Sequence, residues 1–276
     1  MRSVIAAVFV AFSSFAALAQ EDQSSELNKI MTAYDAQGWE AVGRLNIGWG
    51  GMCTGALISP RIVLTAAHCA FNARNGALMD AGDIVFHAGF RNGHATASRR
   101  VKRIVIHPDY VFTGTEPAGN VAHDLALFEL DSDIRLSNVQ PFKTSSRPRK
   151  GQQVGVVSYA HDRADSPSIQ EVCHVLARQR GTLVLSCNVD FGSSGAPIFA
   201  EEDGQPRIVS VVSAKAEVRG RKVALGTNLE QPLSEMMAIL NSGGSGQVVA
   251  APEVNIIRPD TTRRLIGGEG AKFLRP

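Results

Sequence analysis

Residues 62–69 read Ile-Val-Leu-Thr-Ala-Ala-His-Cys, a short apolar run followed by two small residues, a histidine and a cysteine. The run predicts a buried strand at Ile62–Thr65, with His68 just after its end. The ordinary pKa of a histidine side chain lies near neutrality, so His68 suits general base chemistry. A lone histidine after a strand is more often structural, however, and this stretch by itself leaves both interpretations open.

Short apolar runs of the same kind continue on both sides, broken by Gly, Pro, Asn and Asp. Strands this short and this regularly spaced favour a β-sandwich or β-barrel over alternating strands and helices. Apolar side chains that recur on one face predict one amphipathic helix at Pro232–Leu240. The expected strands are Ala41–Ile47, Thr54–Ile58, Ile62–Thr65, Ile84–Ala88, Val101–Ile106, Leu125–Leu130, Val154–Tyr159, Val172–Ala177, Leu183–Cys187, Pro197–Phe199, Ile208–Ser213 and Lys222–Thr227.

The composition of the 276 residues excludes several classes of protein. The net charge of +2, from 28 Lys+Arg and 26 Asp+Glu, does not suggest a nucleic-acid partner. A hydrophobic content of 44% is ordinary for a globular protein and excludes a largely disordered chain. The cysteines and histidines lack the C-x-x-C or H-x-x-x-H spacing of a zinc site, so no metal or other cofactor is predicted. The histidines besides His68 are expected at the surface or satisfied in the core: His87, His94, His107, His123, His161 and His174.

Residues 1–19 have the features of a secretory signal peptide. Arg2 provides a positive N-terminal region, Val4–Phe15 an apolar core, and Ala17-Leu18-Ala19 a small-x-small cleavage site. The apolar core falls short of the ~20 residues that span a bilayer, so no stable membrane insertion is expected. The mature protein is predicted to be secreted, extracellular or periplasmic, after cleavage near Ala19.

Two further motifs carry chemistry. Residues 123–128, His-Asp-Leu-Ala-Leu-Phe, place Asp124 at the start of an apolar strand, where a buried carboxylate needs a donor such as an imidazole N–H. Residues 192–197, Gly-Ser-Ser-Gly-Ala-Pro, predict a tight turn that directs backbone N–H groups to one point, as an oxyanion hole requires. Each motif alone also fits an ordinary turn. The histidine, aspartate and serine motifs in this order are far more specific than any one of them.

The motifs TAAHC (65–69), DLALF (124–128) and GSSGAP (192–197), with CTGALIS at 53–59, closely resemble the trypsin/chymotrypsin-like serine proteases. Within that superfamily the chain resembles the secreted bacterial branch. The resemblance implies an all-β fold of two six-stranded antiparallel Greek-key β-barrels, with the active site between them and a C-terminal helix.

The resemblance covers about residues 39–240, and it divides the chain into segments. The polar stretch Ser137–Gly151, rich in Pro, Arg and Lys, is interpreted as the linker between the two barrels. The predicted segments are a signal peptide (1–19), an N-terminal leader (20–38), barrel one (about 39–136), barrel two (about 151–231), a helix (232–240) and a flexible C-terminal tail (241–276).

In function, the resemblance implies a secreted serine endopeptidase that hydrolyses protein or peptide substrates without a cofactor. His68, Asp124 and Ser194 would form its catalytic triad and act through an acyl-enzyme. The backbone N–H groups of Gly192 and Ser194 would form its oxyanion hole. The alternative is a catalytically weak or inactive trypsin-like fold that acts as a binding module. The sequence does not predict an oligomeric state.

The four cysteines permit three pairings by count alone. The resemblance implies Cys53–Cys69, around the histidine motif, and Cys173–Cys187, ahead of the serine motif. Each bridge closes a loop of about fifteen residues, a length worth roughly 3 kcal/mol in the chain-entropy model.

The chain departs from the family pattern beside the nucleophile. Animal members begin with an IVGG-like terminus freed by cleavage, whose ammonium pairs with an aspartate just before the catalytic serine. Here that position is Ser193, and no IVGG-like run precedes Trp39. We therefore predict that activation by a buried new N-terminus is absent and that other contacts hold the oxyanion loop.

A second departure concerns the specificity pocket. Asn188 stands where trypsin carries a pocket aspartate, and the nearby acid is Asp190. The family's Ser-Trp-Gly at the cleft edge is here Ser213-Ala214-Lys215, with Ser213 expected near the catalytic aspartate. These four residues, Asn188, Asp190, Ser213 and Lys215, are the substrate-binding candidates. Three interpretations of Lys215 stay open: it narrows the pocket, it favours an acidic substrate side chain, or it points to solvent.

Overall fold

The computed structural model describes residues 24–250, except 49, 115–119, 146–147, 219 and 243–246. For residues 247–250 only the backbone is described. The predicted signal peptide and most of the predicted tail lie outside these ranges. Among the described residues, no helix combines the length and apolar character needed to cross a membrane.

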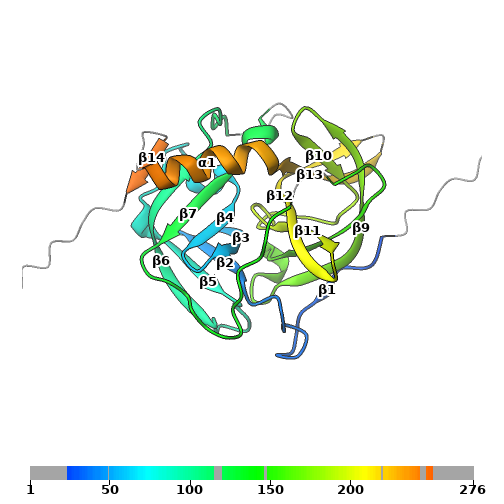
Figure 1. The fold of residues 1–276 in the computed structure, drawn as a ribbon, viewed down its shortest axis with the longest axis horizontal. Coiled ribbons are helices and arrows are strands. Elements are labelled where there is room, and N and C mark those ends of the chain that lie inside the picture. The colour runs from blue at the N-terminus through cyan, green and yellow to red at the C-terminus, as the bar shows by residue number, and fades with distance from the viewer. Residues whose placement is uncertain are drawn as a thin grey trace, which may run out of the picture.

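The strands form two closed antiparallel barrels that lie side by side (Figure 1). Barrel one closes where β6 pairs with β7, and barrel two closes where β8 pairs with β9. Barrel one consists of β2 (Val42–Ile47), β3 (Gly51–Ser59), β4 (Ile62–Thr65), β5 (Ile84–Ala88), β6 (Ala97–Ile106) and β7 (Ala126–Leu130). Barrel two consists of β8 (Gln153–Ser158), β9 (Ser168–Gln179), β10 (Thr182–Leu185), β11 (Pro197–Glu202), β12 (Gln205–Val218) and β13 (Arg221–Asn228).

The predicted fold class is confirmed: each barrel has six strands, and the expected apolar runs lie in them. The largest differences in length occur in β9 and β12, which extend beyond the predicted runs. In β12 the residues after Ser213 are mostly exposed, because they continue as a hairpin with β13 past the buried wall of the barrel. Apolar runs mark only the buried part of such strands.

One additional short strand pairs with each barrel. β1 (Asn28–Lys29) pairs with β9, so part of the predicted leader lies on barrel two. β14 (Gln247–Ala250) pairs with β6, so the backbone of this part of the predicted tail lies against barrel one. The helix α1 (Glu230–Ser242) is longer than the predicted 232–240. It runs along barrel one in Figure 1, and its Met236 and Leu240 are buried in the barrel's apolar core.

An aromatic cluster joins the two barrels. Trp39, from the segment before β2, lies edge-on to Phe199 of β11 with ring centroids 5.0 Å apart. Phe142, from the connection between the barrels, lies 4.7 Å from the same ring. The backbone N–H of Phe142 donates to the carbonyl of Leu57 on β3. The linker therefore contacts both barrels and helps to set how they pack against each other.

The cysteines form two local disulfides, the pairs that the family resemblance implied. Cys53 on β3 is bonded to Cys69, just after His68, and Cys173 on β9 to Cys187, just after β10. All four side chains are buried. The bridges thus fix the segments that lead to the histidine and serine motifs.

Candidate active site

Strand pairing brings His68 and Asp124 together. β4 and β7 are antiparallel neighbours, and Thr65 at the end of β4 pairs with Ala126 at the start of β7. His68 lies on the short 3₁₀ helix that follows β4, and Asp124 lies two residues before β7. The two side chains therefore leave the same edge of barrel one, although 56 positions separate them in the sequence.

Asp124 is fully buried and receives several hydrogen bonds. Its Oδ2 lies 2.8 Å from Nδ1 of His68, and its Oδ1 accepts from the His68 backbone N–H at 2.9 Å. Ser213 Oγ donates to Oδ2 as well. These donors offset the cost of burying a carboxylate. With Nδ1–H directed at the carboxylate, the neutral imidazole has Nε2 as its proton acceptor.

The loop that carries Ser194 is bonded to barrel one through Thr54 on β3. The Thr54 backbone N–H donates to the carbonyl of Ser194 at 2.8 Å, and its Oγ1 donates to the carbonyl of Gly192 at 2.9 Å. The same hydroxyl accepts from the Tyr159 N–H at 3.0 Å. Thr54 is fully buried, so these bonds compete with no solvent and hold the serine loop on the barrel that carries His68.

The peptide before Gly192 has a defined orientation. The carbonyl of Phe191 accepts from the His161 N–H at 2.8 Å. The N–H of a trans peptide points opposite to its carbonyl, so the Gly192 N–H is directed away from His161. Gly192 has φ +96°, and a Cβ there would lie 2.9 Å from Cα of Ala160. Only glycine adopts this conformation in this space without displacing its neighbours.

Ser193 lies beside a buried cation. Its hydroxyl accepts from the Arg163 guanidinium at 3.3 Å and lies 3.2 Å from the Tyr159 carbonyl, to which it can donate. The same guanidinium nitrogen also contacts Ser158 Oγ at 3.4 Å. Arg163 is only 9% exposed and its charged partner, Asp162, lies at 3.0 Å. A side chain of the protein's own interior therefore contacts the residue that precedes Ser194.

Of the four pocket candidates, Asp190 and Lys215 pair with each other, Ser213 donates to Asp124, and Asn188 makes a separate contact. Lys215 Nζ lies 2.6 Å from Asp190 Oδ1 and 4.0 Å from the ring centroid of Phe191. The hydrogen bonds from Lys215 and from the Phe191 N–H hold the pKa of Asp190 below its usual range. Lys215 thus contacts neighbouring side chains rather than extending alone into solvent. Asn188 is exposed, and its backbone N–H donates to Gln170 Oε1 on β9.

Sequence reasoning missed residues that act through contacts alone. Thr54 stands in the quoted CTGALIS motif, but nothing in that motif indicates that its hydroxyl reaches Gly192. Arg163 lies in a polar stretch with no periodic signal. Thr227 Oγ1 donates to the carbonyls of Val121 and Asp124 and so connects β13 to the aspartate segment, again without a local pattern.

Two closed six-stranded barrels, with these motifs at their junction, define the chymotrypsin-like fold. Residues 31–229, more than half of the chain, match the family model described as Trypsin. The chain therefore belongs to the trypsin family of serine proteases.

Individual relatives agree with this assignment. The serine protease SP24D of Anopheles gambiae is 33% identical over 148 residues, which cover 51% of this chain and 49% of that protein. The serine protease filzig of Drosophila melanogaster is 34% identical over 111 residues, 38% of this chain and 6% of that protein. The matched regions thus span half or less of these relatives' own lengths.

A solved structure described as "Structure of Glu endopeptidase in complex with MPD" has the same fold. Its TM-score is 0.65 at 18% sequence identity, and the match covers 79% of this chain and 98% of that chain. At this identity the likeness concerns the fold alone. The resemblance to a bacterial branch stays a prediction, since the curated relatives named above come from insects.

The serine loop predicts a sharp contrast between two glycine substitutions. Gly195 has φ +77°, and a Cβ there would overlap Thr65 Oγ1 and the Thr54 carbonyl; Gly204 has φ +71° and open space around it. Gly204→Ala should cost about 1–2 kcal/mol for the backbone conformation alone. Gly195→Ala should lower the free energy of unfolding by at least about 4 kcal/mol, because losses this large come from a few mechanisms such as overpacking in a buried site. Urea unfolding of both variants measures the difference, and equal losses would contradict the close approach.

Proposed function

We propose that this protein is an active, secreted serine endopeptidase with His68, Asp124 and Ser194 as its catalytic triad. The observation that carries the proposal is the buried Asp124 bonded to both His68 Nδ1 and the His68 N–H. The anchoring of the Ser194 loop on Thr54 of the same barrel supports it. The family assignment implies protein or peptide substrates. Two buried disulfides fit an oxidising compartment.

In the proposed reaction, Ser194 Oγ attacks the carbonyl carbon of the scissile peptide bond. His68 Nε2 accepts the hydroxyl proton and then delivers it to the leaving amine, which forms the acyl-enzyme. A water molecule then attacks the acyl-enzyme, with His68 again accepting and returning the proton, and the carboxylic-acid product is released. Asp124 does not take up the proton; it keeps Nδ1 protonated and stabilises the imidazolium cation. Ser213 and the His68 N–H hold its carboxylate in place.

The backbone N–H groups of Gly192 and Ser194 are proposed to bind the oxyanion of each tetrahedral intermediate. Two contacts of the 3₁₀ helix His161–Arg163 support a preformed oxyanion loop: the His161 N–H bonded to Phe191, and the Arg163 guanidinium at Ser193. The Arg163 guanidinium is permanently charged and belongs to an internal side chain, so this cation is present without a newly cut N-terminus. We therefore propose that the mature protein needs no activating cleavage after removal of its signal peptide.

Substrate selection is proposed to depend on Lys215. The family resemblance places Asp190 and Lys215 at the pocket for the side chain that precedes the scissile bond. Lys215 forms an ion pair with Asp190, and its ammonium lies over the Phe191 ring. This pair is proposed to occupy the space that glycine leaves open in trypsin. The pocket should therefore favour small side chains, because a long one must displace the pair.

The alternative is an inactive trypsin-like binding module, and the Lys215–Asp190 pair is the observation that favours it, since it restricts access. A fluorophosphonate probe separates the two functions. The wild-type protein should be labelled on Ser194, and Asp124→Asn should react about 10,000-fold more slowly, a magnitude taken from the trypsin family itself as the standard example of the triad. Intact mass spectrometry measures the extent of labelling in the wild-type protein and in the variant. Absent labelling of wild type, or labelling that persists in Ser194→Ala, would falsify the active-protease proposal.

A second prediction concerns the role of Arg163 in positioning the oxyanion loop. Arg163→Met should lower kcat by about 100-fold, the loss that follows when one oxyanion donor is removed, with KM nearly unchanged. Arg163→Lys should recover part of the rate because it retains a cation. Arg135→Met, a change to a surface arginine that pairs with Asp133, serves as the control. Full kcat in Arg163→Met, or wild-type activity that appears only after one defined further cut, would contradict this role.

A third prediction tests the pocket. Lys215→Ala should raise kcat/KM for peptides with phenylalanine before the scissile bond, relative to alanine, by about tenfold, because removing a few methylenes from a pocket changes discrimination by this order. Lys222→Ala, an exposed change on β13, is the matched control. An unchanged ratio of the two substrates would show that Lys215 does not restrict the pocket.

A further inference from the structure

A sharp backbone turn presents Asp124 to His68. The φ and ψ angles of Asp124 are −75° and 69°, and the Leu125 N–H donates to the carbonyl of His123 at 2.8 Å. These values define an inverse γ-turn with Asp124 at its centre. The direction in which the Asp124 carboxylate points therefore depends on how this turn is held in place.

One side chain of barrel two holds the turn. Thr227 on β13 directs its Oγ1 at two backbone carbonyls, that of Val121 at 2.6 Å and that of Asp124 at 3.1 Å. A hydroxyl carries one hydrogen, so the two carbonyls share it, with the shorter bond to Val121. Thr227, Val121 and Asp124 are all fully buried, so solvent does not replace this donor.

The position of the donor is itself well fixed. β13 lies between β10 and β12 in the sheet, and the backbone of Thr227 pairs with Thr182 of β10. Val121 adds an apolar contact, since it is buried in a cluster with Val223 and Leu225 of β13. Barrel two thus anchors the aspartate segment of barrel one through one shared hydroxyl bond and one apolar side chain.

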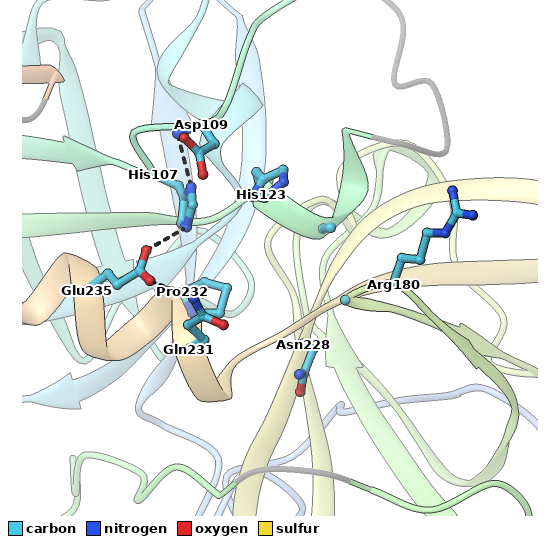
Figure 2. A pocket seen from close by; sticks show the side chains of 10 residues that line it. His107, Asp109, His123, Arg180, Asn228, Gln231, Pro232 and Glu235 are labelled. Atoms are coloured by element: carbon cyan, nitrogen blue, oxygen red, sulfur yellow. Dashed lines mark hydrogen bonds and ion pairs between the residues drawn. The ribbon is translucent and has the colours of Figure 1, made fainter.

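The sequence neighbours of this bonded pair line a cavity of about 330 Å³. Figure 2 shows His123, which precedes Asp124, and Asn228, which follows Thr227, on the lining of this cavity. Residues that border a cavity lack some of the packing contacts that a filled interior supplies. Packing therefore restrains the aspartate segment less at His123, and the bonds from Thr227 contribute more to its position.

We propose that Thr227 is a positioning residue for the catalytic aspartate, and that its hydroxyl fixes the turn that presents the Asp124 carboxylate to His68. The inference rests on the proposed function, because Asp124 stabilises the imidazolium only when its carboxylate faces Nδ1. The Thr227 hydroxyl bonds backbone carbonyls of the aspartate segment, so it acts through Asp124 rather than on a substrate.

The test compares two substitutions of Thr227. Thr227→Val keeps the branched shape and removes the donor, so kcat should fall by about 10- to 100-fold, since misplacement by an ångström costs about 100-fold. The loss should stay well below the roughly 10,000-fold of Asp124→Asn, because the carboxylate keeps its own donors. KM should stay nearly unchanged. Thr227→Ser retains the hydroxyl and should recover most of the rate.

Ser210→Ala is the matched control. Ser210 is fully buried on β12, and its Oγ donates to the backbone carbonyl of Thr227 at 2.8 Å. Ser210→Ala and Thr227→Val each remove one buried hydroxyl bond at the same pair of strands, so both should lower Tm by about 2–4 °C. Only Thr227→Val should lower kcat, because only it releases the aspartate segment.

A second measurement does not require activity. In the Ser194→Ala protein, the proton NMR signal of His68 Nδ1–H reports the hydrogen bond to Asp124, and His68→Gln assigns this signal by removing it. Thr227→Val should shift or broaden the signal, whereas Thr227→Ser and Ser210→Ala should leave it unchanged. If the fluorophosphonate probe does not label the wild-type protein, the proposed function fails, and the NMR signal still decides whether Thr227 positions Asp124.

Three results would overturn the role of Thr227. The first is an unchanged Nδ1–H signal in Thr227→Val, whatever its kcat. The second is a Thr227→Ser variant that loses as much rate as Thr227→Val. The third is a Ser210→Ala variant that changes the signal as strongly, because the turn would then respond to any weakening of β13 rather than to the Thr227 hydroxyl.

Discussion

Thr54 is the residue on which the junction of the two barrels depends. Its backbone N–H and its hydroxyl bond the carbonyls of Ser194 and Gly192, and its own carbonyl accepts from Thr65 Oγ1. A buried hydrogen bond contributes about 1 kcal/mol, but a donor left without its partner there costs about 1–3 kcal/mol. The serine loop of barrel two is thus held in one position against the strand ends of barrel one, and any change in the packing of the barrels would leave several buried groups unsatisfied.

The same logic explains why the candidate site lies between the barrels. Barrel one supplies His68 and Asp124 through the pairing of β4 with β7, and barrel two supplies Ser213 through β12. Neither barrel alone satisfies the Asp124 carboxylate, since its donors come from both. The aromatic contacts of Trp39, Phe142 and Phe199 hold the same junction from a different set of segments.

Local patterns predicted the strands well, because an apolar run marks a buried wall whatever its partners are. Predictions were less complete in two places: the exposed end of β12, and β14, which lies in the segment predicted to be a flexible tail but whose backbone pairs with β6. The family motifs indicated His68, Asp124 and Ser194 as a set. They carried no information about Arg163 or about the pairing of Lys215 with Asp190, because each of these contacts joins segments that have no common pattern in the sequence.

The sequence by itself determined the all-β class, the segments that lead to the motifs and the glycine positions of the serine loop, since these follow from side-chain size, apolarity and backbone freedom at single positions. Only the tertiary structure decided which polar groups meet. Thr54 with Gly192, Arg163 with Ser193, and Lys215 with Asp190 all become neighbours through closure of a barrel or through packing of one segment on another. Hydrogen bonds and ion pairs act over a few ångströms in space, and distance along the chain does not record them.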